Sequence, residues 1–163
     1  WFHGASVGEL QSVIPLIEKL EKKKSIKQVL ITSNTLSSSK VLKNNNFKKT
    51  IHQFFPIDTN FLVKKFIDYW KPSKALFIDS EFWPNTILNL NKKRIPIILI
   101  NGRITKKTFN RWNKFSDFSK NIFKNFNLCL SSSKESYGYL KKLNFKNIKF
   151  IGNLKYSQAE SEN

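Results

Sequence analysis

Short apolar runs rich in β-branched residues alternate along this chain with longer stretches in which apolar residues recur at helical spacing. Apolar runs of about four to eight residues are typical of buried strands, and apolar residues at i, i+3, i+4 and i+7 are typical of amphipathic helices. The run at 97–100, Ile-Ile-Leu-Ile, is apolar on both faces and predicts a strand that is covered on two sides. The predicted strands are Trp1–His3, Gln28–Thr32, Ile51–Phe55, Ala75–Ile78, Pro96–Ile100, Leu128–Leu130 and Ile148–Ile151.

Helices are predicted between these strands. The first begins near Leu10 and reaches Lys24, with one apolar face and another rich in Glu and Lys. Asp58 and Ser133 are suited to cap helices, and Pro84 suits a first helical turn. The remaining predicted helices are Ser37–Lys43, Thr59–Trp70, Pro84–Lys92, Thr108–Phe126 and Lys134–Leu143.

The order of these elements indicates an α/β fold. Strand and helix alternate about six times, which predicts a mostly parallel, doubly wound sheet with helices on both faces. We expect one domain over residues 1–156, with 157–163 beginning a connection to further chain. Ligands of such sheets bind beyond the carboxyl ends of the strands. The segments of interest are therefore 4–9, 33–39, 56–58, 79–85, 101–103 and 152–155.

The composition supports a folded core, since 40% of the residues are hydrophobic and 15 are Phe. The chain contains no Met and opens on Trp1 inside a predicted strand, so we expect it to be an excerpt from a longer protein, cut at both ends. The single cysteine, Cys129, cannot form an internal disulfide and is expected to be a small buried hydrophobe. No run approaches the length of about 18 apolar residues that a membrane-spanning helix needs.

The charge is strongly positive, with 29 Lys and Arg against 11 Asp and Glu and a formal net charge of +18. Such a charge attracts nucleic acid, anionic membranes and phosphorylated ligands. However, only three of the basic residues are Arg, and Asn is abundant. Because Lys and Asn rise together when codons drift toward AT, much of the Lys could simply solvate the surface. Both readings stay open.

The segment His3–Glu9 forms a small-residue loop between the first predicted strand and the first predicted helix. Gly4, Ala5 and Gly8 would let a backbone or a ligand approach closely. Glu9 would repel a phosphate at this helix start, and neither GxGxxG nor GK[ST] is present. The arrangement favours a carboxylate that the helix dipole stabilises and that faces a cleft. The alternative is that Glu9 only stabilises a first helical turn.

Two carboxylates, Asp79 and Glu81, follow the predicted strand Ala75–Ile78. Residues two apart in an extended chain share a side, so both could face one site. Paired carboxylates suit acid–base work or the orientation of a sugar hydroxyl. The alternative is a capped helix start at which Trp83 packs.

Two cations follow later strands. Arg103 comes after the most apolar strand and could bind a phosphate or a carboxylate bidentately. Lys155 follows the last predicted strand, but Lys is so common here that its presence alone indicates little. His52 precedes two Phe residues and is expected to pack rather than to catalyse.

Six short segments stand out in order: FHGASVGE (2–9), TSNTLSSS (32–39), HQFFPID (52–58), EFWPN (81–85), INGRI (100–104) and IGNLKY (151–156). Together they resemble the amino-terminal domain of bacterial 3-deoxy-D-manno-octulosonic acid (Kdo) transferases, at family-like spacing over nearly the whole chain. The resemblance implies the amino-terminal half of a glycosyltransferase-B fold, in which two Rossmann-like halves enclose the active site.

The resemblance also implies a reaction. Kdo would pass from CMP-Kdo to the lipid A precursor, lipid IVA, in lipopolysaccharide core biosynthesis, with inversion of the anomeric centre and with no metal or other cofactor. This half would bind the acceptor, and an absent carboxyl-terminal half would bind CMP-Kdo. The chain alone is therefore expected to be an inactive part of an enzyme.

Family positions carry over residue by residue. Glu9 matches the proton acceptor, and Asp79 and Lys155 match two positions that stabilise the transition state. Asp79 stands where the family usually has Glu, which shortens its reach by one methylene. Ser38 stands where the family often has Gly. The residues expected to bind substrate are Ser6, Gly8, Glu81 and Arg103.

The resemblance also implies a binding partner for the positively charged surface, namely an anionic membrane. Family members are attached to the cytoplasmic face of the bacterial inner membrane by an amino-terminal segment that this chain lacks. A basic, aromatic-rich acceptor domain would suit an anionic membrane surface and a phosphorylated glycolipid.

Two rival functions remain: another glycosyltransferase-B enzyme that shares the sheet, and a basic module that binds nucleic acid. Against the second, Phe dominates the aromatic residues and lies mostly on predicted core faces. No RNP-like, KH-like or zinc-finger pattern is present either, so no nucleic-acid partner is expected.

Overall fold

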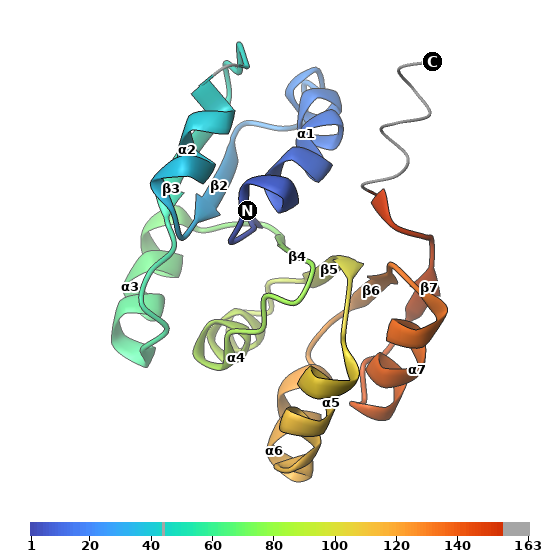
Figure 1. Cartoon of the computed structure of the whole chain (residues 1–163). Coiled ribbons are helices and arrows are strands. Elements are labelled where there is room, and N and C mark those ends of the chain that lie inside the picture. Colours follow the sequence, from blue (N-terminus) through green and yellow to red (C-terminus); the bar gives the residue numbers. More distant parts are fainter. Residues whose placement is uncertain (44, 155–163) are drawn as a thin grey trace. The chain divides into compact units, whose positions relative to one another are not determined.

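The computed structural model of the chain describes residues 1–43 and 45–154 (Figure 1). They form two compact units: Trp1–Phe55 together with Leu154, and Pro56–Asn153. In both units the paired strands run parallel, and helices flank them. The predicted α/β class with a parallel, Rossmann-like sheet is therefore confirmed.

The first unit is organised around its central strand. In chain order its elements are β1 (Phe2–His3), α1 (Val7–Glu21), β2 (Val29–Ser33), α2 (Leu36–Lys43) and β3 (Thr50–Phe54). The strand order is β3-β2-β1, and β2, which has a neighbouring strand on each side, is buried over its whole length. Helix α1 contacts β2, and its buried face includes Leu10, Val13 and Ile17 at the predicted helical spacing.

The second unit has the strand order β4-β5-β6-β7. In chain order its elements are α3 (Asn60–Trp70), β4 (Ala75–Ile78), α4 (Pro84–Lys92), β5 (Ile97–Gly102), α5 (Lys106–Asn113), α6 (Ser116–Phe123), β6 (Leu128–Ser131), α7 (Lys134–Lys142) and β7 (Ile148–Phe150). Phe82, Phe123, Phe126 and Phe145 form an aromatic cluster in its core, with ring centroids 4.7 to 6.2 Å apart. Such rings bury large apolar areas, and here they pack in edge-on, tilted and stacked pairs that stabilise the unit.

The predicted single helix Thr108–Phe126 is wrong, because two helices, α5 and α6, occupy this stretch. The backbone leaves the helical region at Phe115, which has φ −115° and ψ 56°. The break lets Trp112 pack edge-on against Phe123, with ring centroids 4.9 Å apart. The hydroxyl of Ser119 donates to the carbonyl oxygens of Trp112 and Phe115. It thus supplies a hydrogen-bond donor to carbonyl groups at the end of α5 and the start of α6, where the regular helical pattern is interrupted.

The other predicted elements overlap the observed ones, and β4 and α4 have the predicted bounds. Pro84 occupies the first turn of α4, and Ser133 caps α7 by accepting the Ser136 N–H, both as predicted. Asp58 was expected to cap the helix that follows it, but Thr59 does so. The Asp58 carboxylate instead accepts hydrogen bonds at the start of α4, from the backbone N–H groups of residues 85 and 86.

The predicted end of the domain at residue 156 and the connection at 157–163 lie outside the described residues and stay predictions. Within the described ranges, no helix is long and apolar enough to cross a membrane.

Candidate functional site

The candidate segments begin where strands end. Residues 4–6 join β1 to α1, 34–35 join β2 to α2, 79–83 join β4 to α4, and 103–105 join β5 to α5. Each of these connections starts at the carboxyl end of a parallel strand, where ligands of such sheets bind. The predicted site residues that the structure places on or directly after these connections are Ser6, Gly8 and Glu9 in the first unit and Asp79, Glu81 and Arg103 in the second.

Glu9 lies in the first turn of α1 and is half-buried. Its carboxylate folds back over the preceding loop and accepts hydrogen bonds from the Ala5 N–H to Oε2 and from the Ser6 hydroxyl to Oε1, both at 2.8 Å. The Glu9 N–H in turn donates to Ser6 Oγ at 3.3 Å. This is a variant of the capping box, in which the acidic side chain reaches the residue before the cap.

The capping arrangement gives Glu9 a structural role, since it stabilises the first turn of α1 as one of the two interpretations of the sequence predicted. The same arrangement is compatible with a role as general base. A carboxylate can accept about four hydrogen bonds, so accepting these two does not by itself prevent it from taking a proton. The two bonds also hold the carboxylate in one orientation at the helix start, where the dipole favours its charged form. A fixed, ionised carboxylate is what a general base requires.

The segment after β2 contacts the small-residue loop. The Gly4 N–H donates to the carbonyl oxygen of Thr32 at 3.2 Å, and the Ser38 hydroxyl donates to that of Ala5 at 3.3 Å. Two segments that carry the resemblance, 2–9 and 32–39, therefore lie against each other.

A buried histidine lies beneath this loop. The ring of His3 is stacked on Phe55 with 3.8 Å between centroids, and its Nδ1 lies 3.0 Å from the hydroxyl of Thr32. His52 packs edge-on against Phe54, as expected, but its Nε2 also lies 2.8 Å from the hydroxyl of Ser33. Burial lowers the pKa of His52, which favours its neutral form.

Asp79 adopts a left-handed backbone at the end of β4, with φ 63°, and Asn101 does the same at the end of β5, with φ 54°. The two positions are adjacent, because Ile78 pairs with Ile100. Asp and Asn tolerate this conformation better than most residues, and such strain recurs at functional sites. The backbone of Asp79 also holds the end of β5. The Asp79 N–H donates to the Ile100 carbonyl oxygen, and the Asp79 carbonyl oxygen accepts the N–H of Arg103.

The left-handed turn at Asp79 overturns one premise of the sequence interpretation. Residues 79–81 are not an extended strand, so strand alternation does not place the two carboxylates on one side. The Glu81 carboxylate accepts a hydrogen bond from Trp83 Nε1 at 2.8 Å, which orients it toward the start of α4. The side chain of Arg103 is exposed, and Lys155 lies outside the described residues.

Neither Asn101 nor Ser38 was predicted to be a site residue, although both lie in segments of interest, 101–103 and 33–39. Asn101 is 1% exposed, although an amide side chain at a strand end would usually be solvated. Its position directly before Gly102, after an apolar strand, was a usable signal, since Asn–Gly favours left-handed turns. Ser38 had no such signal, because the carbonyl that it contacts is 33 residues away.

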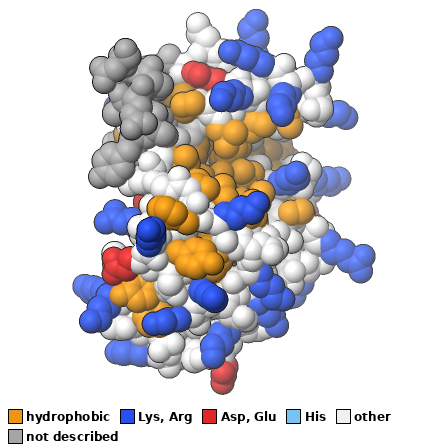
Figure 2. Space-filling model, turned by 90° about the vertical axis from the view of Figure 1, so that its right-hand side faces the viewer, with side chains coloured by type: hydrophobic (Ala, Val, Ile, Leu, Met, Phe, Trp, Pro, Cys, Tyr) orange, Lys and Arg blue, Asp and Glu red, His pale blue; other side chains and the backbone are white. Residues whose placement is uncertain are grey.

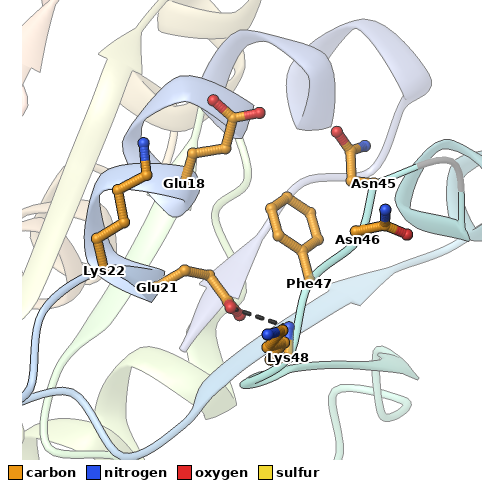
Figure 3. A pocket seen from close by; sticks show the side chains of 7 residues that line it. All are labelled: Glu18, Glu21, Lys22, Asn45, Asn46, Phe47 and Lys48. Carbon is orange, nitrogen blue, oxygen red and sulfur yellow. Dashed lines mark hydrogen bonds between the residues drawn. The ribbon is translucent and has the colours of Figure 1, made fainter.

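A pocket of about 500 Å³ lies in the first unit, at the end of the sheet opposite the carboxyl ends of the strands (Figure 3). Its lining residues are Glu18, Glu21, Lys22, Asn45, Asn46, Phe47 and Lys48. Glu21 has a structural role there, because it accepts hydrogen bonds from the N–H groups of Lys48 and Lys49 and from the Thr50 hydroxyl. The pocket lies at the amino ends of the strands and is separate from the candidate segments.

Cys129 is fully buried in β6, as predicted, and burial raises the pKa of its thiol to about 12. Among the residues that the structure describes, no three or more His, Cys, Asp or Glu side chains gather in a way that could hold a metal ion.

Residues 1–158 match a family model described as 3-deoxy-D-manno-octulosonic-acid transferase (kdotransferase). The chain is 36% identical to the 3-deoxy-D-manno-octulosonic acid transferase of Rickettsia felis and 37% identical to that of Rickettsia prowazekii, over 160 residues in each case. Each alignment covers 98% of this chain and 34% of the relative. The chain thus spans about a third of the length of these relatives.

Among solved structures, the chain is similar to the UDP-GlcNAc 2-epimerase from Neisseria meningitidis bound to UDP-GlcNAc, with a TM-score of 0.67 and 13% sequence identity. The match covers 98% of this chain and 49% of that one. At this identity the likeness shows the fold alone, a Rossmann-like α/β arrangement.

Proposed function

The chain belongs to the 3-deoxy-D-manno-octulosonic-acid transferase family, and from this premise we propose that it is the acceptor-binding half of an enzyme that transfers Kdo to the lipid A precursor. The observation that carries the proposal is the family match over residues 1–158. Its support from geometry is that the family-like segments begin where parallel strands end.

The proposed reaction is a single displacement with inversion. A hydroxyl oxygen of lipid IVA attacks the anomeric carbon of Kdo, the bond from that carbon to the phosphate of CMP breaks, and CMP leaves with the electron pair. Glu9 accepts the proton of the attacking hydroxyl. The carboxylate of Asp79 stabilises positive charge that develops on the sugar, and Lys155 stabilises negative charge on the departing phosphate.

The other proposed residues bind the acceptor. Ser6 and Gly8 precede Glu9 by three residues and by one. The hydroxyl of Ser6 offers a polar contact to a sugar, and Gly8 has no side chain that would exclude one. In the second unit Glu81 is oriented by Trp83 and can accept from a sugar hydroxyl. The exposed Arg103 suits a phosphate of the glycolipid.

The experiment that tests this function uses the full-length protein that contains the chain. With CMP-Kdo and lipid IVA, we expect mass spectrometry to detect Kdo-bearing lipid, and we expect the 163-residue chain alone to give none, because the donor is bound elsewhere. UDP-GlcNAc serves as the rival donor. Product from UDP-GlcNAc and none from CMP-Kdo would favour another glycosyltransferase-B enzyme, and turnover by the chain alone would contradict the division into two halves.

We also propose that the chain works at an anionic membrane surface, the cytoplasmic face of the bacterial inner membrane. Lys and Arg side chains are spread over the face that Figure 2 shows rather than gathered in one patch. On α3, however, Phe61 and Tyr69 are 74% and 77% exposed beside the exposed Lys64 and Lys65. Exposed aromatic rings next to lysines are typical of surfaces that contact anionic bilayers.

Binding to vesicles should therefore depend on both charge and α3. We expect the chain to bind vesicles with anionic lipid, to bind neutral vesicles weakly, and to lose binding as salt shortens the Debye length to about 8 Å or less. Replacing Phe61 and Tyr69 together by Ser should weaken binding at least about tenfold at unchanged charge. Co-sedimentation with vesicles measures both effects.

The matched control replaces Phe115 and Phe118 by Ser, because these rings are 68% and 51% exposed at α6. Equal losses in the two double variants would contradict a specific role of α3. Equal binding to neutral and anionic vesicles would mean that the positive charge is compositional drift. Duplex DNA that displaced the chain from vesicles at low concentration would favour the nucleic-acid alternative.

A further inference from the structure

Ser38 lies in the first turn of α2 with its side chain fully buried. Its hydroxyl donates to the carbonyl oxygen of Ala5 at 3.3 Å and lies 2.7 Å from the hydroxyl of Thr35. The Ser38 N–H donates to Thr35 Oγ1 at 3.3 Å. The hydroxyl of Ser38 therefore links the start of α2 to the loop that precedes α1.

Ala5 is the residue that this link shares with Glu9. Its carbonyl accepts from Ser38, while its N–H donates to the Glu9 carboxylate at 2.8 Å. The preceding peptide is also held, because the Gly4 N–H donates to the Thr32 carbonyl. The carbonyl that Ser38 holds belongs to the peptide group between Ala5 and Ser6, and both of these residues donate to the Glu9 carboxylate, so moving this peptide group would displace those donors.

Helix capping alone does not account for the Ser38 hydroxyl. The side chain of Thr35 already accepts the Ser38 N–H, which is the bond that a cap residue supplies. The hydroxyl of Ser38 makes a contact outside its own helix. A buried hydroxyl at this place costs free energy unless it finds partners, and its partners are the Thr35 hydroxyl and, outside its own helix, the Ala5 carbonyl in the loop of Glu9.

The same arrangement occurs in the second unit. Ser136 lies in the first turn of α7, its N–H donates to the cap residue Ser133, and its hydroxyl donates to the Ile104 carbonyl at 3.3 Å. Ile104 follows the candidate residue Arg103 in the loop after β5. In both units a buried serine of one helix holds the backbone of a loop that carries a candidate site residue.

We propose that Ser38 is a positioning residue for Glu9: it fixes the peptide group between Ala5 and Ser6 and, through the donors on these two residues, the orientation of the carboxylate. The proposal rests on the proposed role of Glu9 as general base. Rates of proton transfer depend steeply on such orientation, since displacements of about 1 Å can cost about 10²-fold. Ser38 touches neither substrate nor reacting atoms, so its effect is indirect.

Kinetics of the full-length enzyme test this role. Ser38→Ala should lower kcat about 5- to 20-fold with KM within about twofold, because it disturbs the base and not the binding surface. In a Glu9→Gln background the same substitution should change kcat less than about twofold, since there is no base left to misplace. This non-additivity is the mark of residues that act together.

The matched control is Ser119→Ala. Ser119 is equally buried, and its hydroxyl donates only to carbonyl oxygens within the α5–α6 region. Loss of this hydroxyl should destabilise the protein by a similar amount but leave kcat unchanged. Hydrogen exchange adds a readout independent of activity: amides 4–6 should exchange at least about fivefold faster in Ser38→Ala and not in Ser119→Ala.

Three results would overturn the proposal: kcat of Ser38→Ala within about twofold of wild type, an undiminished effect in the Glu9→Gln background, or unchanged exchange at amides 4–6. A full-length protein with no Kdo transfer at all would instead refute the proposed function. The exchange measurement then still decides whether Ser38 holds the loop.

Discussion

The Glu9→Gln variant of the full-length enzyme should have a kcat at least about a hundredfold below wild type, with little change in acceptor affinity or stability. Positioned general bases contribute about 10²- to 10⁴-fold in rate, and an amide cannot take the proton of the attacking hydroxyl. Glutamine can still accept the Ala5 N–H and bond with Ser6, so the cap of α1 survives. Steady-state kinetics, thermal unfolding and acceptor titration measure the three properties.

The matched control for Glu9 is Glu135→Gln. Glu135 is also an acidic residue in the first turn of a helix, α7, so the substitution removes the same charge from a similar place. It should leave kcat unchanged. A folded Glu9→Gln enzyme with near-normal turnover would show that Glu9 is only part of the helix cap, and Glu81 would become the next candidate for the base.

Asp79→Asn should lower kcat at least about tenfold, which corresponds to about 1.4 kcal/mol of transition-state stabilisation. Asparagine is chosen because it tolerates the left-handed backbone that Asp79 adopts at φ 63°, so the substitution removes the charge without adding strain. An alanine at this position would add a backbone cost of about 1–2 kcal/mol and confuse the two effects. The ratio of kcat values, with the melting temperature alongside, is the measurement.

Asp68→Asn is the control for Asp79, since it removes a charge from the same unit at a surface ion pair with Lys93. Surface pairs of this kind contribute about 0–1 kcal/mol to stability, so both activity and fold should persist. If Asp79→Asn retains a kcat within about twofold of wild type, Asp79 is not part of the site.

The bounds of secondary-structure elements were predictable where helix-start residues and the apolar spacing indicate the same element. The bounds of α4 were readable because Pro84 suits a first turn and the apolar spacing then runs to Lys92. The break between α5 and α6 was not readable, because helical periodicity continues through it. The break accompanies the packing of Trp112 on Phe123, a tertiary contact that no local pattern contains.

The candidate site was predictable as a set of segments but not as contacts. The spacing Ser6-x-x-Glu9 is that of a capping box, so the bond from the Glu9 N–H to the Ser6 hydroxyl oxygen was predictable from the sequence. The carboxylate of Asp58, in contrast, bonds backbone groups 27 and 28 residues further along. Partners so distant depend on how the strands and helices assemble, and only the structure reveals them.

The burial of Cys129 has a practical consequence for spectroscopy. A thiol reacts with maleimides and iodoacetamides as its thiolate, and with a pKa of about 12 fewer than about one in 10⁴ molecules carry one at pH 7. The side chain is also fully buried. In the 163-residue chain, a cysteine introduced at the exposed Tyr69 should therefore take up a fluorophore or a spin label alone, without removal of Cys129. Burial thus makes this chain suitable for single-site labelling.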